Sequence, residues 1–151
     1  QSKQLQIPLA CINVEMPTEP LLAFDTDGIA GQTYRIYQAG FNRKPDVEGL
    51  GYWIRQLESG KTIQWATDHF VRSNEFTSLY EDAKTVTNIR YTELLYRNTL
   101  GRPYEKAGLD YWVGQLDNGF VTRNTMLEAF ADSLENRSNV ASAIADGIWF
   151  A

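Results

Sequence analysis

The stretch that decides the fold is residues 43–57, Arg-Lys-Pro-Asp-Val-Glu-Gly-Leu-Gly-Tyr-Trp-Ile-Arg-Gln-Leu, because the chain carries it twice. The second copy, residues 102–116, reads Arg-Pro-Tyr-Glu-Lys-Ala-Gly-Leu-Asp-Tyr-Trp-Val-Gly-Gln-Leu. In both copies an Arg is followed six residues later by Gly-Leu, then by Tyr-Trp and Gln-Leu, and a Gly closes the unit. Self-similarity of this kind indicates an internal duplication, so we expect two copies of one structural unit.

Apolar residues within each copy recur at the spacing of an α-helix. One predicted helix face carries Leu50, Trp53, Ile54 and Leu57. The second copy has the same face at Leu109, Trp112, Val113 and Leu116. Residues three and four apart lie on one side of a helix, so we expect both faces to point into a core. Asp46 suits the N-cap of the first helix, and Gly60 and Gly119 suit the helix ends, because glycine enters left-handed backbone space freely.

The matching extends beyond the motif. Tyr34, Tyr37 and Phe41 form an amphipathic stripe before the first copy, and Tyr96 and Leu100 match the last two at a constant offset of 59 residues. One residue is inserted after the closing Gly of the second copy, so the positions that follow match at an offset of 60 residues. We therefore expect the same order of helices in both halves.

The sequence predicts an all-α fold, in which two tandem helical repeats pack on a shared core and an extended N-terminal arm precedes them. We expect the arm over residues 1–24, the first repeat over residues 25–81 and the second repeat over residues 82–151, forming one compact unit. Prolines interrupt the arm, and the apolar run at residues 7–12 could pair as an edge strand.

Composition excludes several classes of protein. The net charge of −5 argues against a nucleic-acid partner, which needs a clustered basic face. No apolar run reaches the roughly 18 residues of a membrane-spanning helix, and no signal peptide is visible. Cys11 is the single cysteine, so no internal disulfide is expected.

Ten residues form the repeat signature, to which we assign structural roles. They are Arg43, Gly49, Leu50, Trp53 and Leu57 in the first copy and Arg102, Gly108, Leu109, Trp112 and Leu116 in the second. The two arginines precede a helix N-terminus, where a guanidinium can bind an anion, pair with a carboxylate or brace loop carbonyls. Their identical framework positions favour the brace.

Aromatic residues are the first candidates for a binding site. Adjacent helical residues point about 100° apart, so Tyr52 and Tyr111 lie at the boundary of the face that buries the neighbouring Trp. Trp65 and Trp149 are not explained by the repeat, and with Phe150 they form either a contact patch or caps on the core. We take Tyr52, Tyr111, Trp65 and Trp149 as candidate ligand-binding residues.

Asp25 and Asp27 are the candidate metal ligands, because carboxylates at alternate positions begin a calcium-binding loop. An EF-hand also needs a Glu at position twelve, and Ile36 stands there. Turn and N-cap chemistry is therefore the favoured role, and we expect no cofactor, with calcium as the one candidate.

Catalysis is not expected. His69 is the only histidine, and no nucleophile motif stands near it. No Walker loop, GxGxxG or HExxH pattern is present either. We therefore interpret the protein as a non-enzyme.

The repeat resembles a bacterial domain of unknown function, DUF4214. Residues 23–60 are similar to one unit, residues 94–119 to a second unit and residues 133–150 to the closing segment. In the second copy the proline falls one place earlier, at Pro103, and Tyr104 takes its place, so the loop before that helix can differ.

The resemblance implies a location and a kind of function. Such domains occur in secreted or surface-attached bacterial proteins, including adhesin-like proteins with hemolysin-type calcium-binding repeats, and they have no established catalytic residues. We therefore expect a helical interaction or structural module of a secreted or cell-surface protein, with a protein or a surface polysaccharide as its partner. The alternative is a carbohydrate-binding module that uses exposed aromatic rings.

Overall fold

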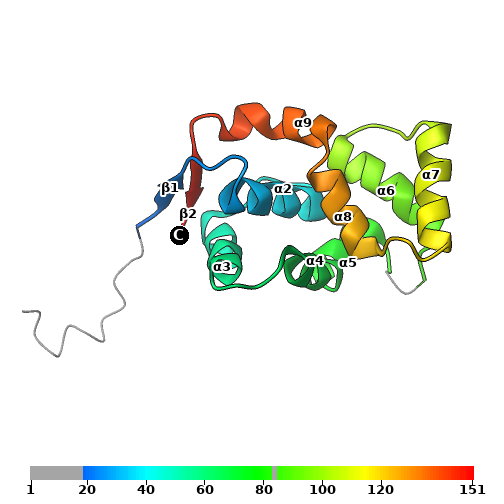
Figure 1. Cartoon of the computed structure of the whole chain (residues 1–151), viewed down its shortest axis with the longest axis horizontal. Helices are drawn as coiled ribbons and strands as arrows, with labels where there is room; N and C mark the ends of the chain where they lie inside the picture. Colours follow the sequence, from blue (N-terminus) through cyan, green and yellow to red (C-terminus); the bar gives the residue numbers. More distant parts are fainter. Residues whose placement is uncertain (1–18, 83–84) are drawn as a thin grey trace, which may run out of the picture.

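The computed structural model describes residues 19–82 and 85–151, so the expected edge strand at residues 7–12 and Cys11 lie outside the described residues. The described residues form β1 (Leu21–Ala23), α2 (Ile29–Phe41), α3 (Val47–Glu58), α4 (Ile63–Val71), α5 (Asn74–Tyr80), α6 (Asn88–Leu100), α7 (Lys106–Asp117), α8 (Arg123–Ala131), α9 (Leu134–Ile144) and β2 (Ile148–Phe150). Figure 1 shows helices throughout the body and one small pair of strands, so the all-α prediction is confirmed. No helix in the described ranges is long and apolar enough to cross a bilayer.

Side-chain caps start most of these helices. The predicted cap is confirmed at α3, where Asp46 accepts a hydrogen bond from the Gly49 amide at 2.8 Å. At five further helices a side-chain hydroxyl accepts the equivalent hydrogen bond from a first-turn amide. The helices are α4, α5, α6, α8 and α9, and the hydroxyls belong to Thr62, Ser73, Thr87, Thr122 and Ser133. These side chains satisfy amides that would otherwise have no partner in the first helical turn.

Left-handed residues end the matching helices at matching places. Asn42 and Gly101 close α2 and α6 with φ of 49° and 67°. The predicted glycine stops follow α3 and α7, where Gly60 and Gly119 have φ of +106° and +70°. Such angles are costly for residues that carry a Cβ, which explains why glycine punctuates both copies.

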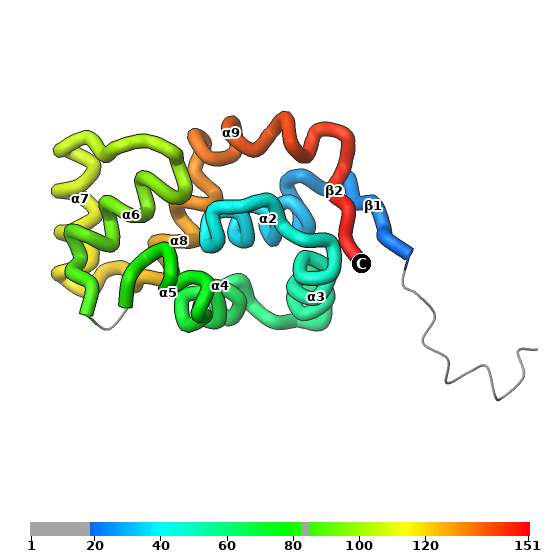
Figure 2. The backbone as a smooth tube through the Cα atoms, turned by 180° about the vertical axis from the view of Figure 1, so that it is seen from behind, coloured from blue at the N-terminus to red at the C-terminus, as the bar shows by residue number. Residues whose placement is uncertain are grey.

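The two repeats share one body. Helices α2 to α5 correspond in order to α6 to α9, and the equivalent helices α4 and α8 pack against each other, while α2 contacts both α6 and α8. Helices α3 and α7, which carry the repeated motif, lie toward opposite ends of the long axis (Figures 1 and 2). The motif copies therefore face separate surroundings although they belong to one core.

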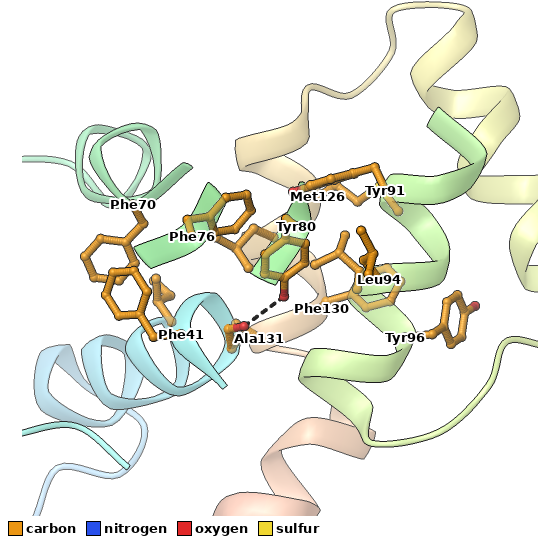
Figure 3. Packing of buried hydrophobic residues seen from close by; sticks show 14 of the residues in the cluster. Phe41, Phe70, Phe76, Tyr80, Tyr91, Leu94, Tyr96, Met126, Phe130 and Ala131 are labelled. Carbon is orange, nitrogen blue, oxygen red and sulfur yellow. Dashed lines mark hydrogen bonds between the residues drawn. The ribbon is translucent and has the colours of Figure 1, made fainter. Parts of the chain in front are cut away.

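The main core joins side chains from both repeats. Phe76 and Tyr80 of α5 stack at 4.0 Å, and Tyr91 of α6 lies 5.8 Å from Tyr80. The Tyr80 hydroxyl donates to the Ala39 carbonyl of α2 at 3.0 Å, the dashed line in Figure 3. Burial of such rings is the main favourable term in folding, so this cluster ties the two units together.

A second apolar cluster covers α3. Leu50 and Ile54, each 1 % exposed, meet side chains of α9 and β2. Strand β2 pairs antiparallel with β1, which places residues 21–23 of the predicted arm beside the C-terminal strand. The Ala151 amide donates to the Val47 carbonyl at 3.0 Å, so the chain end runs against the first turn of α3.

Helix α7 has no such cover. None of its residues is fully buried, although Trp112 and Leu116 pack against the main core. The prediction that Leu109 and Val113 match the inward positions of the first copy is therefore wrong in degree, because both are only half-buried. The reason is long-range: β2 covers α3, and Asp110 stands where the first copy has Gly51 under the chain end.

Candidate functional site

The repeated arginine of the first copy is held inside the chain. The Arg43 guanidinium contacts Glu75 of α5 through two bonds, Nε to Oε1 at 2.6 Å and Nη2 to Oε2 at 3.3 Å. It also donates to the Lys44 carbonyl at 3.2 Å and lies over the Tyr37 ring, 5.0 Å from its centroid. The guanidinium therefore pairs with a carboxylate and also binds a loop carbonyl, which are two of the roles that the sequence left open.

The second copy reproduces this arrangement. Arg102 binds Glu135 of α9 through Nε and Nη2, at 2.7 and 2.9 Å, and donates to the Pro103 carbonyl at 3.0 Å. Its guanidinium carbon lies 5.1 Å from the Tyr96 ring centroid. The duplicated arginines thus have duplicated partners, and bidentate pairing of this kind orients as well as attracts.

A tyrosine completes each cluster. The Tyr37 hydroxyl donates to the Asp46 carboxylate, and the Tyr96 hydroxyl donates to Glu105 at 3.2 Å. Burial, together with the neighbouring carboxylate, raises the pKa of both tyrosines to about 12. Both hydroxyls therefore stay protonated at neutral pH and serve as donors, which excludes them as phenolate nucleophiles under those conditions.

A pocket of about 150 Å³ opens beside this cluster in the second repeat. Its apolar wall comes from α6, α7 and α8 and consists of Tyr96, Leu100, Trp112, Ala129 and Phe130. Arg102, Ser133 and Glu135 line the remaining side. The Trp112 and Tyr96 rings lie 5.3 and 5.1 Å from the Phe130 ring, so three aromatic residues frame the opening.

The first repeat carries larger side chains at two of the equivalent positions. Phe41 stands where the second copy has Leu100, and its ring lies 4.9 Å from Phe70 and is 8 % exposed. His69 stands where the second copy has Ala129, and its ring packs 4.3 Å from Trp65. Two residues that line the pocket, Leu100 and Ala129, are therefore smaller than their counterparts in the first copy.

The four aromatic residues predicted to bind a ligand are not brought together. Tyr52 on α3 and Tyr111 on α7 are 46 % and 58 % exposed and belong to helices at opposite ends (Figure 1). Trp149 is 55 % exposed on β2, and Trp65 is half-buried 5.7 Å from Trp53. Each ring keeps an open surface, but the four do not form one platform.

The predicted calcium ligands have partners within the chain. The Asp25 carboxylate accepts from the Ala30 amide at 3.1 Å in the first turn of α2, and Asp27 pairs with Arg137 of α9 at 3.0 Å. Across the described ranges, no three His, Cys, Asp or Glu side chains gather as metal ligands would. Gly28, and not Asp25, occupies the N-cap position of α2, and the Asp25 carboxylate reaches the first turn from three residues before it.

Sequence reasoning missed two features of the molecule. The first is the pocket, which is lined by Leu100 and Ala129. A comparison of side-chain size between the two copies would have drawn attention to both positions, because the first copy has Phe41 and His69 there. The second feature is a buried arginine, Arg35, whose Nε donates to Asp132 at 3.0 Å. Its matching residue in the second copy is Leu94, so no repeated pattern pointed to it.

The family model described as "Domain of unknown function (DUF4214)" matches residues 33–76 and 67–140. The two matched ranges contain the two copies of the motif, which agrees with the duplication described above. Neither a search of curated proteins nor a search of solved structures found a match.

Proposed function

We propose, from the premise that this chain belongs to the DUF4214 family, that it is a non-enzymatic helical interaction module of a secreted or cell-surface bacterial protein. The observation that carries the proposal is the pocket beside Trp112, an opening with an apolar wall where two lining residues are smaller than their counterparts in the first repeat. The family resemblance supports the location.

The use of the repeated residues supports a binding role for the surfaces that differ. Arg43 and Arg102 of the repeat signature bind a glutamate in each copy, and the tyrosine beside each arginine donates to a second carboxylate. These side chains are therefore occupied in holding the fold. Because these residues hold the fold in both copies, the pocket of the second repeat is free to bind a partner without loss of the core. Few convergent, unpaired titratable groups border the opening, which supports a non-enzymatic role.

Selection from a random peptide display library tests this proposal. The native chain is the target, and an Ala129→His variant, which places the first copy's residue in the pocket, is used for counter-selection. We expect peptides that bind the native chain and not the variant. Peptides that bind both forms with equal affinity would place the binding surface elsewhere. A selection that yields no peptide would contradict a peptide-binding role.

Carbohydrate binding is the second candidate, because Tyr52, Tyr111 and Trp149 hold half-exposed rings of the kind that stack on sugars. A glycan array probed with the native chain separates the two functions. Glycan binding that is lost in Tyr111→Ala, with no selected peptide, would favour the carbohydrate role.

A further inference from the structure

We propose that the second-repeat pocket receives a single planar aromatic side chain from a partner polypeptide. This inference rests on the proposed interaction role and names the group that is recognised. It follows from the duplication, because the first repeat shows which chemical groups complete this cluster when the chain supplies them itself.

In the first repeat an aromatic ring fills the site. The Phe41 ring lies edge-on to Tyr37 at 5.0 Å and tilted against Phe70 at 4.9 Å, with the Arg43 guanidinium carbon 5.8 Å from its centroid. The second repeat keeps the equivalents of all three neighbours and has Leu100 in place of the ring. A guest ring would therefore find the same partners that Phe41 finds.

The walls favour such a guest. Phe130 is nearly perpendicular to Tyr96, at 88°, and inclined by 57° to Trp112, so ring faces and edges at differing orientations surround the opening. Aromatic pairs in offset or edge-to-face arrangements contribute beyond the burial of their area. Arg102, already over Tyr96, adds a cation that can lie near a second ring.

The polar side of the pocket disfavours a sugar or a charged group. Arg102 donates to Glu135 and Glu105, so the charges at the rim are paired. Ser133 donates to the Phe130 carbonyl and accepts from the Asn136 amide. A hydroxyl-rich ligand would compete with these bonds, whereas an uncharged ring leaves them intact.

The size of the pocket sets the size of the guest. A volume of about 150 Å³ is below the roughly 300–1,000 Å³ that is typical of sites for whole small ligands. It suits one side-chain ring inserted from outside, with the rest of the partner lying over the half-exposed surface around it. An anchor of this kind is the usual centre of a protein interface.

The test uses indole and p-cresol as probes, which carry the rings of Trp and Tyr, with methyl glucoside as the sugar comparison. The Trp112 indole N–H and the methyl groups of Leu100 and Ala129 are followed by NMR during titration of the full chain. We expect saturable shifts of these three residues with both aromatic probes and none with the glucoside. Saturable shifts with the glucoside alone would overturn the proposal.

Two reciprocal variants sharpen the test. Leu100→Phe with Ala129→His rebuilds the first copy's residues and should weaken indole binding at least about tenfold. Phe41→Leu with His69→Ala opens the first copy and should create a second site, seen as indole-dependent shifts at Trp53. Circular dichroism melting establishes that each variant folds, and either variant alone is sufficient to decide.

The outcomes separate this inference from the proposed function. Library peptides can bind the native chain without depending on an aromatic residue, so that no aromatic-to-Ala change abolishes binding. In that case the inference of an aromatic anchor is wrong and the interaction role stands. If aromatic probes bind at Trp112 and no peptide does, the pocket's preference is correct and the interaction role is contradicted.

Discussion

Gly49 and Gly108 of the repeated motif stand where a side chain would collide with the tyrosine and the helix cap. A Cβ on Gly108 would lie 2.1 Å from the Tyr96 hydroxyl oxygen and 2.4 Å from Glu105 Oε1, and one on Gly49 would lie 2.8 Å from the Tyr37 hydroxyl oxygen. Tyr96 is 4 % exposed, so its ring has little room to move away. The glycine of the Gly-Leu pair is therefore needed for the tyrosine to reach the cap.

Gly108→Ala should lower the free energy of unfolding by about 1–3 kcal/mol, as overpacking does. Gly114 lies in the same helix with nothing within 4 Å of an added Cβ, so Gly114→Ala is the matched control. It should raise stability by about 0.5–1 kcal/mol, because alanine restricts the unfolded chain and favours the helix. Urea unfolding measures both, and equal stability of the two variants would contradict the collision.

The ion pair of Arg102 gives the chain an acid-sensitive component. The Arg102 guanidinium holds the pKa of Glu135 and of Glu105 below their ordinary values. A depressed folded-state pKa means that this stabilisation is present above the unfolded pKa of about 4.3 and is lost as pH falls through the folded values. Stability should therefore fall below about pH 4.3.

Glu135→Gln should remove part of this dependence. The side chains of Arg102 and Glu135 are 37 % and 40 % exposed, so solvent screening limits the loss at neutral pH to less than about 1 kcal/mol. The urea midpoints of the native chain and the variant should differ at pH 7 and converge at about pH 3. If the native chain and the variant had the same urea midpoint at pH 7 as well as at low pH, the pair would contribute nothing to stability.

Local features of the helices could be predicted from the sequence, whereas contacts between distant segments could not. The cap at Asp46 and the stops at Gly60 and Gly119 could be predicted because they depend on neighbours within a few residues. The contact of the chain end with α3 was not, because it joins residues about a hundred positions apart. The same holds for the exposure of α7, whose pattern copies α3 while its surroundings do not.

The C-terminal strand depends on a glycine in α3. An added Cβ on Gly51 would lie 1.7 Å from the Ala151 carbonyl oxygen, which also accepts a 2.7 Å hydrogen bond from Arg55. Gly51→Ala should displace β2, reduce hydrogen-exchange protection of the β1–β2 amides and destabilise the chain by about 1–3 kcal/mol. Asp110→Ala, at the equivalent place in α7, should change stability by less than about 0.5 kcal/mol. Unchanged protection in Gly51→Ala would mean that the chain end does not depend on this close approach.

The whole molecule is held together by the contacts between repeats. Helix α8 of the second repeat packs on both α2 and α4 of the first, and the main core draws side chains from both halves. The shared core was predictable from the duplication, because a single unit cannot cover its own apolar face. The arrangement of α8 against α2 was not, since the motif carries no information on how the copies meet.

Because of this packing, a destabilising substitution in the central helix α8 should lower the stability of both repeats together. Leu127 of α8 is 0 % exposed and lies beside Gly40 of α2. Leu127→Ala should cost about 2–5 kcal/mol, as large-to-small core changes do, while Leu134→Ala, at a residue 87 % exposed, should change stability by less than about 0.5 kcal/mol.

Fluorine-labelled tryptophan reports on the two ends separately, through Trp53 in α3 and Trp112 in α7. Both signals should lose their native shift at one common urea midpoint, lowered in Leu127→Ala, because the halves share a core and unfold together. Two midpoints, with only the Trp112 signal moved by the substitution, would show that the repeats are separate folding units.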